Sequence, residues 1–209
     1  MNELVKVIEY IRTKLASFSR QDLKETPTRT IVVDQLLVAL GWDVRDPDQA
    51  QLEYPTVDGK SVDYALKIDG KPVILVEAKA LGDPLTDVKA ITQVVGYAAN
   101  AGIVWCILTN GVDWQVYCSV ENCQAPDKLM FEVSIDARKS EGQSVQQLAE
   151  KMWLFSREGM AKGMLDEKRK QTFTDRKVRK ALDVIIPQPP DNVVISLASH
   201  VVLSTCSKG

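Results

Sequence analysis

The sequence is poor in the residues from which many familiar sites are built. It has one histidine, His200, and four cysteines that form no Cys-x-x-Cys pair, so a zinc site is not expected. No apolar run approaches the roughly 20 residues that span a bilayer, and the charged, amphipathic N-terminus is unlike a signal peptide. These absences predict a cytoplasmic protein that does not associate with a membrane.

Several enzyme motifs are also missing. The chain has no GxxxxGK[ST] phosphate loop, no dinucleotide-binding fingerprint and no nucleophile elbow. A small-molecule enzyme of a familiar type is therefore not expected. The formal net charge of −2 does not by itself indicate a nucleic-acid partner, although acidic residues elsewhere can mask a local basic face.

What is present is the composition of a globular protein. With 209 residues, of which 45% are hydrophobic and 26% charged, the chain can build one well-buried core. Hydrophobic periodicity predicts helices over residues 3–18, 27–41 and 86–100, the second with Thr26 as its N-cap and Gly41 as its C-cap. Alternating and apolar runs predict strands over residues 51–55, 61–68, 72–79, 103–108 and 114–120, with 131–135 as a further edge strand.

The order of these elements predicts an α/β fold with a mixed β-sheet flanked by helices. The pair Asp69-Gly70 marks a tight turn, so the strands on either side should form an antiparallel hairpin. The helix that follows should carry the chain by a right-handed crossover to a parallel strand.

The C-terminal part differs in composition from the rest. Residues 1–140 are expected to form the main domain, and 141–209 a partly flexible helical and basic extension that begins with a helix over 144–155. A solvated helix face is the ordinary interpretation of its basic stretch, and contact with phosphates is the alternative. The pattern assigns no role to residues 187–209. The basic residues of the stretch are Lys162, Lys168, Arg169, Lys170, Arg176, Lys177, Arg179 and Lys180.

Charged residues at the ends of the predicted hairpin indicate a site. The strand Val73–Lys79 is apolar on both faces, yet it ends in Glu77-Ala78-Lys79, and buried charges must be paired or bind a metal. With the turn near Asp69-Gly70, paired residue numbers sum to about 140, which places Asp63 opposite Glu77. Side chains in that position lie about 4.5–5.5 Å apart on one face of the sheet.

Two carboxylates so close together repel each other unless a cation neutralises them. Oxygen ligands alone favour Mg²⁺, with Mn²⁺ as a substitute. Lys79, on the same face as Glu77, can balance the carboxylates, hold a water or stabilise a developing negative charge. The alternative is a plain cross-strand Asp–Lys pair on a solvated face, but Val73 and Leu75 on that face indicate that it is covered.

The crossover helix contributes Gln93 and Tyr97, which are four residues apart and so share a helix face. They could equally be an ordinary surface glutamine and a core tyrosine. Because this helix follows the Glu77 strand directly, its first turns can stand beside the strand ends.

Taken in order, Asp63, Glu77-Ala78-Lys79 and Gln93-Val94-Val95-Gly96-Tyr97 resemble the PD-(D/E)xK nuclease superfamily, with the QxxxY motif of its RecB-like and type I restriction branches. The segment from Glu25 through Arg29 to Val44 is similar to the start of the nuclease domain in type I restriction R subunits. Predicted type IV restriction endonucleases look similar. The resemblance covers roughly residues 20 to 120.

The resemblance implies a restriction-endonuclease-like core and a role for each matching residue. Asp63 and Glu77 match the metal-binding carboxylates, Lys79 the catalytic lysine, and Glu25 an acidic residue that completes the metal site. Gln93 and Tyr97 match a motif that organises the site and contacts DNA. The chain departs from the family in two ways: Val62, not proline, precedes Asp63, and no helicase motor follows.

The function expected from the resemblance is a Mg²⁺-dependent restriction endonuclease that hydrolyses DNA phosphodiester bonds. A catalytically silent nuclease-fold module that binds DNA or a partner is the main alternative. An RNA-processing or phage-defence nuclease is a weaker one. Other restriction–modification subunits are expected partners, and the residues leave open whether the chain forms a homodimer. Recognition sequence and dependence on base modification are not readable from these residues.

Overall fold

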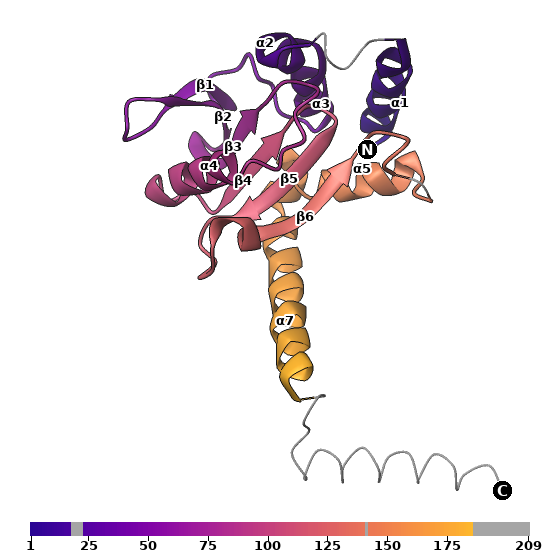
Figure 1. Cartoon of the computed structure of the whole chain (residues 1–209). Helices are drawn as coiled ribbons and strands as arrows, with labels where there is room; N and C mark the ends of the chain where they lie inside the picture. Colours follow the sequence, from indigo (N-terminus) through magenta and orange to yellow (C-terminus); the bar gives the residue numbers. More distant parts are fainter. Residues whose placement is uncertain (18–22, 141, 186–209) are drawn as a thin grey trace, which may run out of the picture. The chain divides into compact units, whose positions relative to one another are not determined.

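The structure is a computed structural model that describes residues 1–17, 23–140 and 142–185 (Figure 1). The chain divides into two compact units, Met1–Arg169 and Lys170–Gly209. Residues 187–209, to which the sequence assigns no role, lie outside the described residues. Four members of the predicted basic stretch have side chains that are likewise not described: Arg176, Lys177, Arg179 and Lys180.

A single mixed sheet of six strands forms the centre of the first unit (Figure 1). Its strands follow one another in sequence order, and all neighbours are antiparallel except β3 and β4, which are parallel. The α/β fold class predicted from the sequence is thereby confirmed. The strands are β1 (Ala50–Pro55), β2 (Ser61–Ile68), β3 (Lys71–Ala78), β4 (Trp105–Thr109), β5 (Asp113–Cys118) and β6 (Leu129–Ser134).

The crossover from β3 to β4 runs through α4 (Val88–Asn100). Asp87 caps this helix by accepting a hydrogen bond from Lys89 N at 2.9 Å, which satisfies one of the free N–H groups of its first turn. All five residues of β4 are buried, as expected for a central strand covered on both faces. One face of the sheet, with Leu75, Cys106 and Leu108, packs against the apolar side of α4.

The remaining helices in the described ranges are α1 (Asn2–Ser17), α2 (Glu25–Thr28), η1 (Arg29–Val33), α3 (Asp34–Ala39), the 3₁₀ turn η2 (Ala125–Lys128), α5 (Val145–Trp153), α6 (Arg157–Ala161) and α7 (Met164–Ile185).

The second predicted helix starts and continues differently from the prediction. It begins at Glu25 with Lys24 as the N-cap residue, so the expected cap at Thr26 was wrong. Pro27 is accommodated in the first turn, because the N–H groups of a first turn have no acceptor within the helix and the lack of one costs nothing. The chain then passes through a π-helical turn, η1, before α3, a feature that hydrophobic periodicity does not reveal.

A second part of the core is formed by the aromatic side chains of Trp42, Trp114 and Phe155. Trp114 of β5 stacks on Phe155 with ring centroids 5.7 Å apart, and Trp42 Nε1 donates to the Phe155 carbonyl oxygen at 3.0 Å. Both tryptophans are fully buried. The segment around α5 is therefore built into the core of the first unit.

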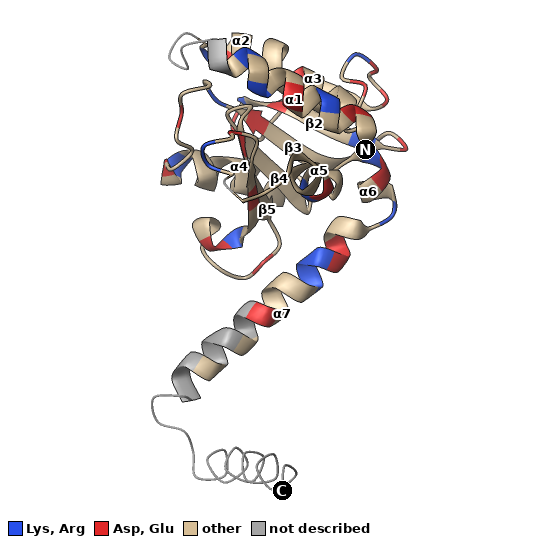
Figure 2. Ribbon diagram, turned by 90° about the vertical axis from the view of Figure 1, so that its right-hand side faces the viewer, with Lys and Arg blue, Asp and Glu red and all other residues tan. Residues whose placement is uncertain are grey.

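Charges of both signs lie along the described part of α7 (Figure 2). Asp166 and Glu167 occupy its first turn, so the helix does not present basic residues alone. None of the helices described is long and apolar enough to cross a membrane.

Candidate active site

The β2–β3 hairpin brings Asp63 and Glu77 to one end of the sheet. Tyr64 lies opposite Val76 and Ala65 opposite Leu75, and this register places Asp63 opposite Glu77 at the next position outward. Asp63 is only 6% exposed, and its Oδ2 accepts a hydrogen bond from the Ala78 backbone N at 2.6 Å. The two carboxylates are opposed as expected from the sequence, but the pairing depends on an irregularity that the sequence did not reveal. Ile68 pairs with Lys71 next to the turn, and a register shift between Leu66 and Lys67 moves the pairing by one residue.

Lys79 stands just beyond the end of β3, held by its backbone. Its N–H donates to the Thr109 carbonyl oxygen at 2.7 Å, which extends the β3–β4 pairing by one residue. Its ammonium lies 2.7 Å from Glu77 Oε1. Burial favours the neutral amine, but the hydrogen bond and charge of Glu77, with the charges of Glu25 and Asp63, together raise the pKa of Lys79. Lys79 is therefore a charged group at neutral pH.

The surroundings of Asp63 favour its neutral form, whereas those of Lys79 favour the charged form. Burial raises the pKa of Asp63 to about 6, because water no longer solvates the carboxylate, and the charges of Glu77 and Glu53 add to this effect. The hydrogen bond from Ala78 and the charge of Arg29 oppose it. The ionised form of Asp63 is therefore destabilised even with Arg29 beside it, and a further cation would stabilise that form.

Arg29 is a site residue that the sequence reasoning did not single out. Its Nη1 lies 2.7 Å from Asp63 Oδ1 and 2.6 Å from Glu53 Oε1, so one guanidinium joins two carboxylates from β1 and β2. The guanidinium also lies 5.1 Å from the centre of the Tyr64 ring, within the range of a cation–π contact. The only signal in the sequence was its place in the segment that resembles the R subunits.

Arg29 and Glu53 each lie at an irregular position of the backbone. Arg29 is the first residue of the π-helical turn, and Glu53 has a φ of +49°, unusual for a residue other than glycine. Ser61 Oγ donates to Glu53 Oε2 at 2.7 Å and holds the side chain in place. Irregular turns and positive φ values are often retained at functional sites. Glu53 lies in an edge strand, where nothing in the sequence marks it.

Glu25, predicted from the resemblance as a third metal ligand, opens α2 and is exposed to solvent. Its negative charge is one of those that raise the pKa of Lys79, so it acts on the site through its charge. Its predicted role at a metal stays a prediction.

The donor atoms of the site suit a hard divalent cation in chemistry. Mg²⁺ in enzymes is commonly bound through one or two carboxylates, with waters and substrate phosphates as its other ligands, and Asp63 and Glu77 can provide such a pair. In the described part of the chain, no three His, Cys, Asp or Glu residues are grouped so as to hold a metal ion. Instead Arg29 neutralises Asp63, and Lys79 neutralises Glu77.

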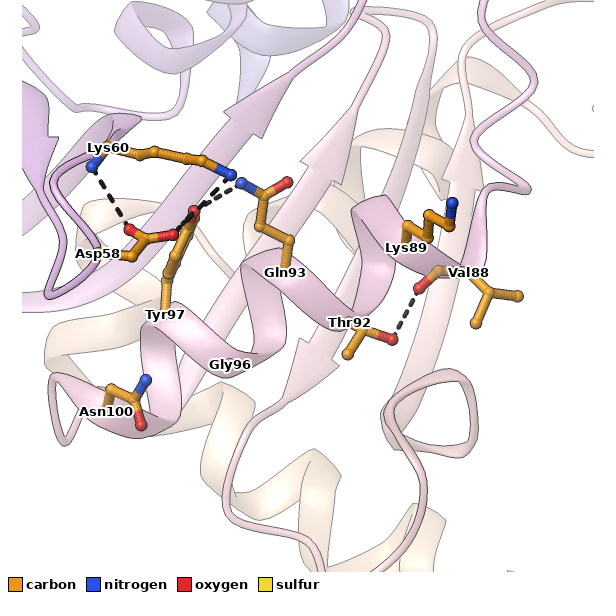
Figure 3. Close-up of a pocket in the computed structure, with 9 residues that line it drawn as sticks. All are labelled: Asp58, Lys60, Val88, Lys89, Thr92, Gln93, Gly96, Tyr97 and Asn100. Atoms are coloured by element: carbon orange, nitrogen blue, oxygen red, sulfur yellow. Dashed lines mark hydrogen bonds and ion pairs between the residues drawn. The ribbon is translucent and has the colours of Figure 1, made fainter.

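Gln93 and Tyr97 are joined to each other, as their spacing predicts, and to the β1–β2 turn. Gln93 Nε2 donates to Tyr97 Oη at 2.5 Å, and Tyr97 Oη donates to Asp58 Oδ2 at 3.0 Å (Figure 3). Tyr97 is 8% exposed. The hydrogen bonds found for this pair thus tie α4 to the turn that precedes β2, which carries Asp63.

Comparison with known proteins agrees with this geometry. Residues 49–122 match the family described as the type I restriction enzyme R protein N terminus. No curated protein and no solved structure matches the chain. The matched range includes Asp63, Glu77, Lys79, Gln93 and Tyr97, but it begins after Glu25 and Arg29. The resemblance to the R-subunit nuclease domain and the restriction-endonuclease-like fold, both expected from the motifs, are confirmed.

Proposed function

We propose that this chain is a Mg²⁺-dependent endonuclease of a restriction system that hydrolyses DNA phosphodiester bonds. One observation carries the proposal. Asp63, Glu77 and Lys79 meet at one end of the sheet, inside the segment that matches the R protein family. The match supports a restriction-related nuclease domain, and the proposal adds to it the metal, the DNA substrate and the catalytic roles.

Asp63 and Glu77 would hold Mg²⁺, or Mn²⁺ in its place, and Glu25 would assist from α2. The cation, when bound, supplies Lewis-acid stabilisation of the charge that develops on the phosphorus oxygens. The Ala78 N–H fixes the orientation of the Asp63 carboxylate through its 2.6 Å hydrogen bond. Arg29 Nη1, at 2.7 Å from Asp63 Oδ1, places a positive charge beside that carboxylate.

Lys79 acts in the proposal as a charged donor. Because its raised pKa keeps the ammonium protonated, it can orient the attacking water and stabilise negative charge in the transition state. A role as general base would require loss of that proton, which the neighbouring Glu77 disfavours. The ammonium is therefore assigned to positioning and charge stabilisation rather than to proton abstraction.

A catalytically silent binding module is the second candidate function. It is favoured by the two ion pairs, since Arg29 and Lys79 already neutralise the carboxylates that a metal would need. In that case the same sheet end would serve DNA or a partner subunit without cleaving. We propose other restriction–modification subunits as partners, a cytoplasmic location and, as a further proposal, a homodimer.

The decisive experiment is nicking of supercoiled plasmid with Mg²⁺, with Mn²⁺ and with EDTA. Wild-type protein should cleave with either metal and not with EDTA. Glu77→Gln and Lys79→Ala should each lower the rate by at least about 100-fold, because each removes charge that acts on the transition state. Lys71→Ala changes an exposed lysine at the far end of β3 and should cleave normally.

Matched circular dichroism spectra would show that all variants fold. If both site variants cleave at the wild-type rate, the activity belongs to a contaminant or to another site, and the assignment fails. If the wild type binds DNA but does not cleave it with either metal, the binding module is the better description. Parallel single-stranded, duplex and RNA substrates identify the substrate class.

A further inference from the structure

A groove of about 480 Å³ runs between the β1–β2 turn and one side of α4 (Figure 3). Asp58 and Lys60 line it from the turn, and Lys89, Gln93, Gly96 and Asn100 from the helix. The helix positions recur every three or four residues, so they form one continuous side of α4. The groove is open to solvent along its length, which suits an extended polymer better than a small molecule.

Gly96 forms the floor of this groove without a structural reason to be glycine. Its φ lies outside the positive range, and a Cβ added there would meet no other atom within 4 Å. Glycine in the middle of a helix is less stable than alanine, because the unfolded chain has more freedom to lose. The absence of a side chain at Gly96 leaves open space on the surface of α4, which a ligand could occupy.

The charges around the groove suit a polyanion. Lys60 lies on one wall and Lys89 on the other, and both are exposed. The only carboxylate of the lining, Asp58, accepts from Tyr97 Oη at 3.0 Å, and the Lys60 ammonium lies 3.9 Å from it. An exposed ion pair of that length is weak, so Lys60 can turn to another anion at little cost.

The groove also adjoins the candidate active site. Lys60 immediately precedes β2, and Asp63 follows three residues later, roughly 10 Å along the strand. A DNA strand that leaves the groove past Lys60 therefore has about 10 Å to cover before it reaches Asp63.

We propose that the groove holds the sugar–phosphate backbone of the DNA strand that flanks the scissile bond. The backbone lies against Gly96, and Lys60 and Lys89 neutralise its phosphates. Gln93 and Tyr97 act as positioning residues, since Tyr97 fixes the Asp58 wall of the groove. The proposal rests on the proposed nuclease function for its choice of DNA as the occupant.

The test uses the full chain and a fluorescein-labelled DNA duplex, with binding followed by anisotropy in EDTA so that no strand is cut. Gly96→Leu fills the floor of the groove, and we expect it to weaken binding at least tenfold. Ala99→Leu is the matched control, because it adds a leucine side chain to an exposed position of α4 outside the groove lining. It should bind as the wild type does.

Thermal unfolding separates a blocked groove from a damaged fold. Gly96→Ala should raise Tm by about 2–4 °C, as expected for a glycine replaced in a helix of a protein this size. Gly96→Leu should unfold no earlier than the wild type. Lys60→Gln and Lys89→Gln should each reduce the slope of log K against log salt by about 1, as the loss of one phosphate contact predicts.

The outcomes distinguish this proposal from the nuclease assignment. Undiminished binding by folded Gly96→Leu overturns the groove while leaving any metal-dependent cleavage intact. Binding that depends on Gly96, in a wild type that never cleaves, supports the groove and overturns the nuclease. A wild type that binds neither duplex nor single-stranded DNA overturns the groove proposal.

Discussion

Asp63 is the residue on which the candidate site depends most. It is buried, accepts a backbone hydrogen bond from Ala78, and shares a face with Glu77. The guanidinium of Arg29 offsets only part of the cost of its charge, since its pKa still rises to about 6. A carboxylate held in this way binds a cation more favourably than a solvated one, because neutralisation relieves an existing repulsion.

The titration of Asp63 should be visible in the stability of the metal-free protein. In the folded state the group keeps its proton up to about pH 6, whereas an ordinary aspartate loses it near 3.8. Between those values unfolding releases a proton, so the free energy of unfolding falls as pH rises. We expect the wild type to lose up to about 3 kcal/mol over this range relative to Asp63→Asn.

Urea unfolding of both proteins in EDTA, between pH 4 and pH 7, measures this difference. The comparison with Asp63→Asn removes the contribution of other carboxylates. One of these is Glu53, whose pKa is lowered by its hydrogen bond to Arg29, so that its contribution to the free energy of unfolding rises with pH. A difference between the two proteins that stays constant across the range would show that Asp63 titrates normally.

At the scale of elements, the π-helical turn η1 is held in place by the β4–β5 turn. Gly111 in that turn has a φ of +84°, and a Cβ there would lie 2.9 Å from Val32 Cγ1 and 3.2 Å from Thr28 Cγ2. The segment 28–32, which includes Arg29, therefore packs directly against the backbone of Gly111. The position of Arg29 therefore depends on a glycine more than 80 residues away in the chain.

Gly111→Ala should destabilise the protein by about 2–4 kcal/mol. A side chain in the left-handed region costs about 1 kcal/mol, and overpacking against η1 adds about 1–3 kcal/mol. Gly102→Ala is the matched control, with a φ of +69° but nothing within 4 Å of the added Cβ, so it should cost only the first part. Equal losses for both variants in urea unfolding would show that η1 moves aside freely.

At the scale of the whole molecule, the compact unit Met1–Arg169 includes elements well beyond the candidate site. Leu148, Met152 and Phe155 are buried in it, and Arg169 Nε donates to Glu121 Oε1 at 2.8 Å. The core that supports the site is thus completed by residues after position 140, where the sequence predicts a domain boundary.

Two truncations test where the folded unit ends. A chain of residues 1–169 should unfold cooperatively with a Tm within a few degrees of the full chain. A chain of residues 1–140 should be unfolded or aggregated, because it loses Phe155 and with it the stacking partner of Trp114. Circular dichroism and gel filtration measure both. A cooperatively folded 1–140 would place the boundary where the sequence predicts it.

Local patterns in the sequence determined most of the fold. Turn residues at Asp69-Gly70 and apolar runs predicted β2, β3 and their antiparallel pairing, and helical spacing predicted α1, α4 and α5, because each of these signals acts between near neighbours. The register shift between Leu66 and Lys67 was not predicted. The pairing outward of that shift brings Asp63 opposite Glu77, as expected, and the spacing of Gln93 and Tyr97 predicted that they share a helix face. These parts of the site were therefore readable from the chain alone.

Only the tertiary structure decided what neutralises the carboxylates and where the helix motif points. Arg29 meets Asp63 and Glu53 through a π-helical turn and a positive φ, and neither follows from periodicity or residue type. Tyr97 bonds to Asp58 because the β1–β2 turn reaches α4, a contact between segments 39 residues apart. Such contacts depend on how complete elements pack, so the sequence determined the carboxylate pair and the three-dimensional structure determined its partners.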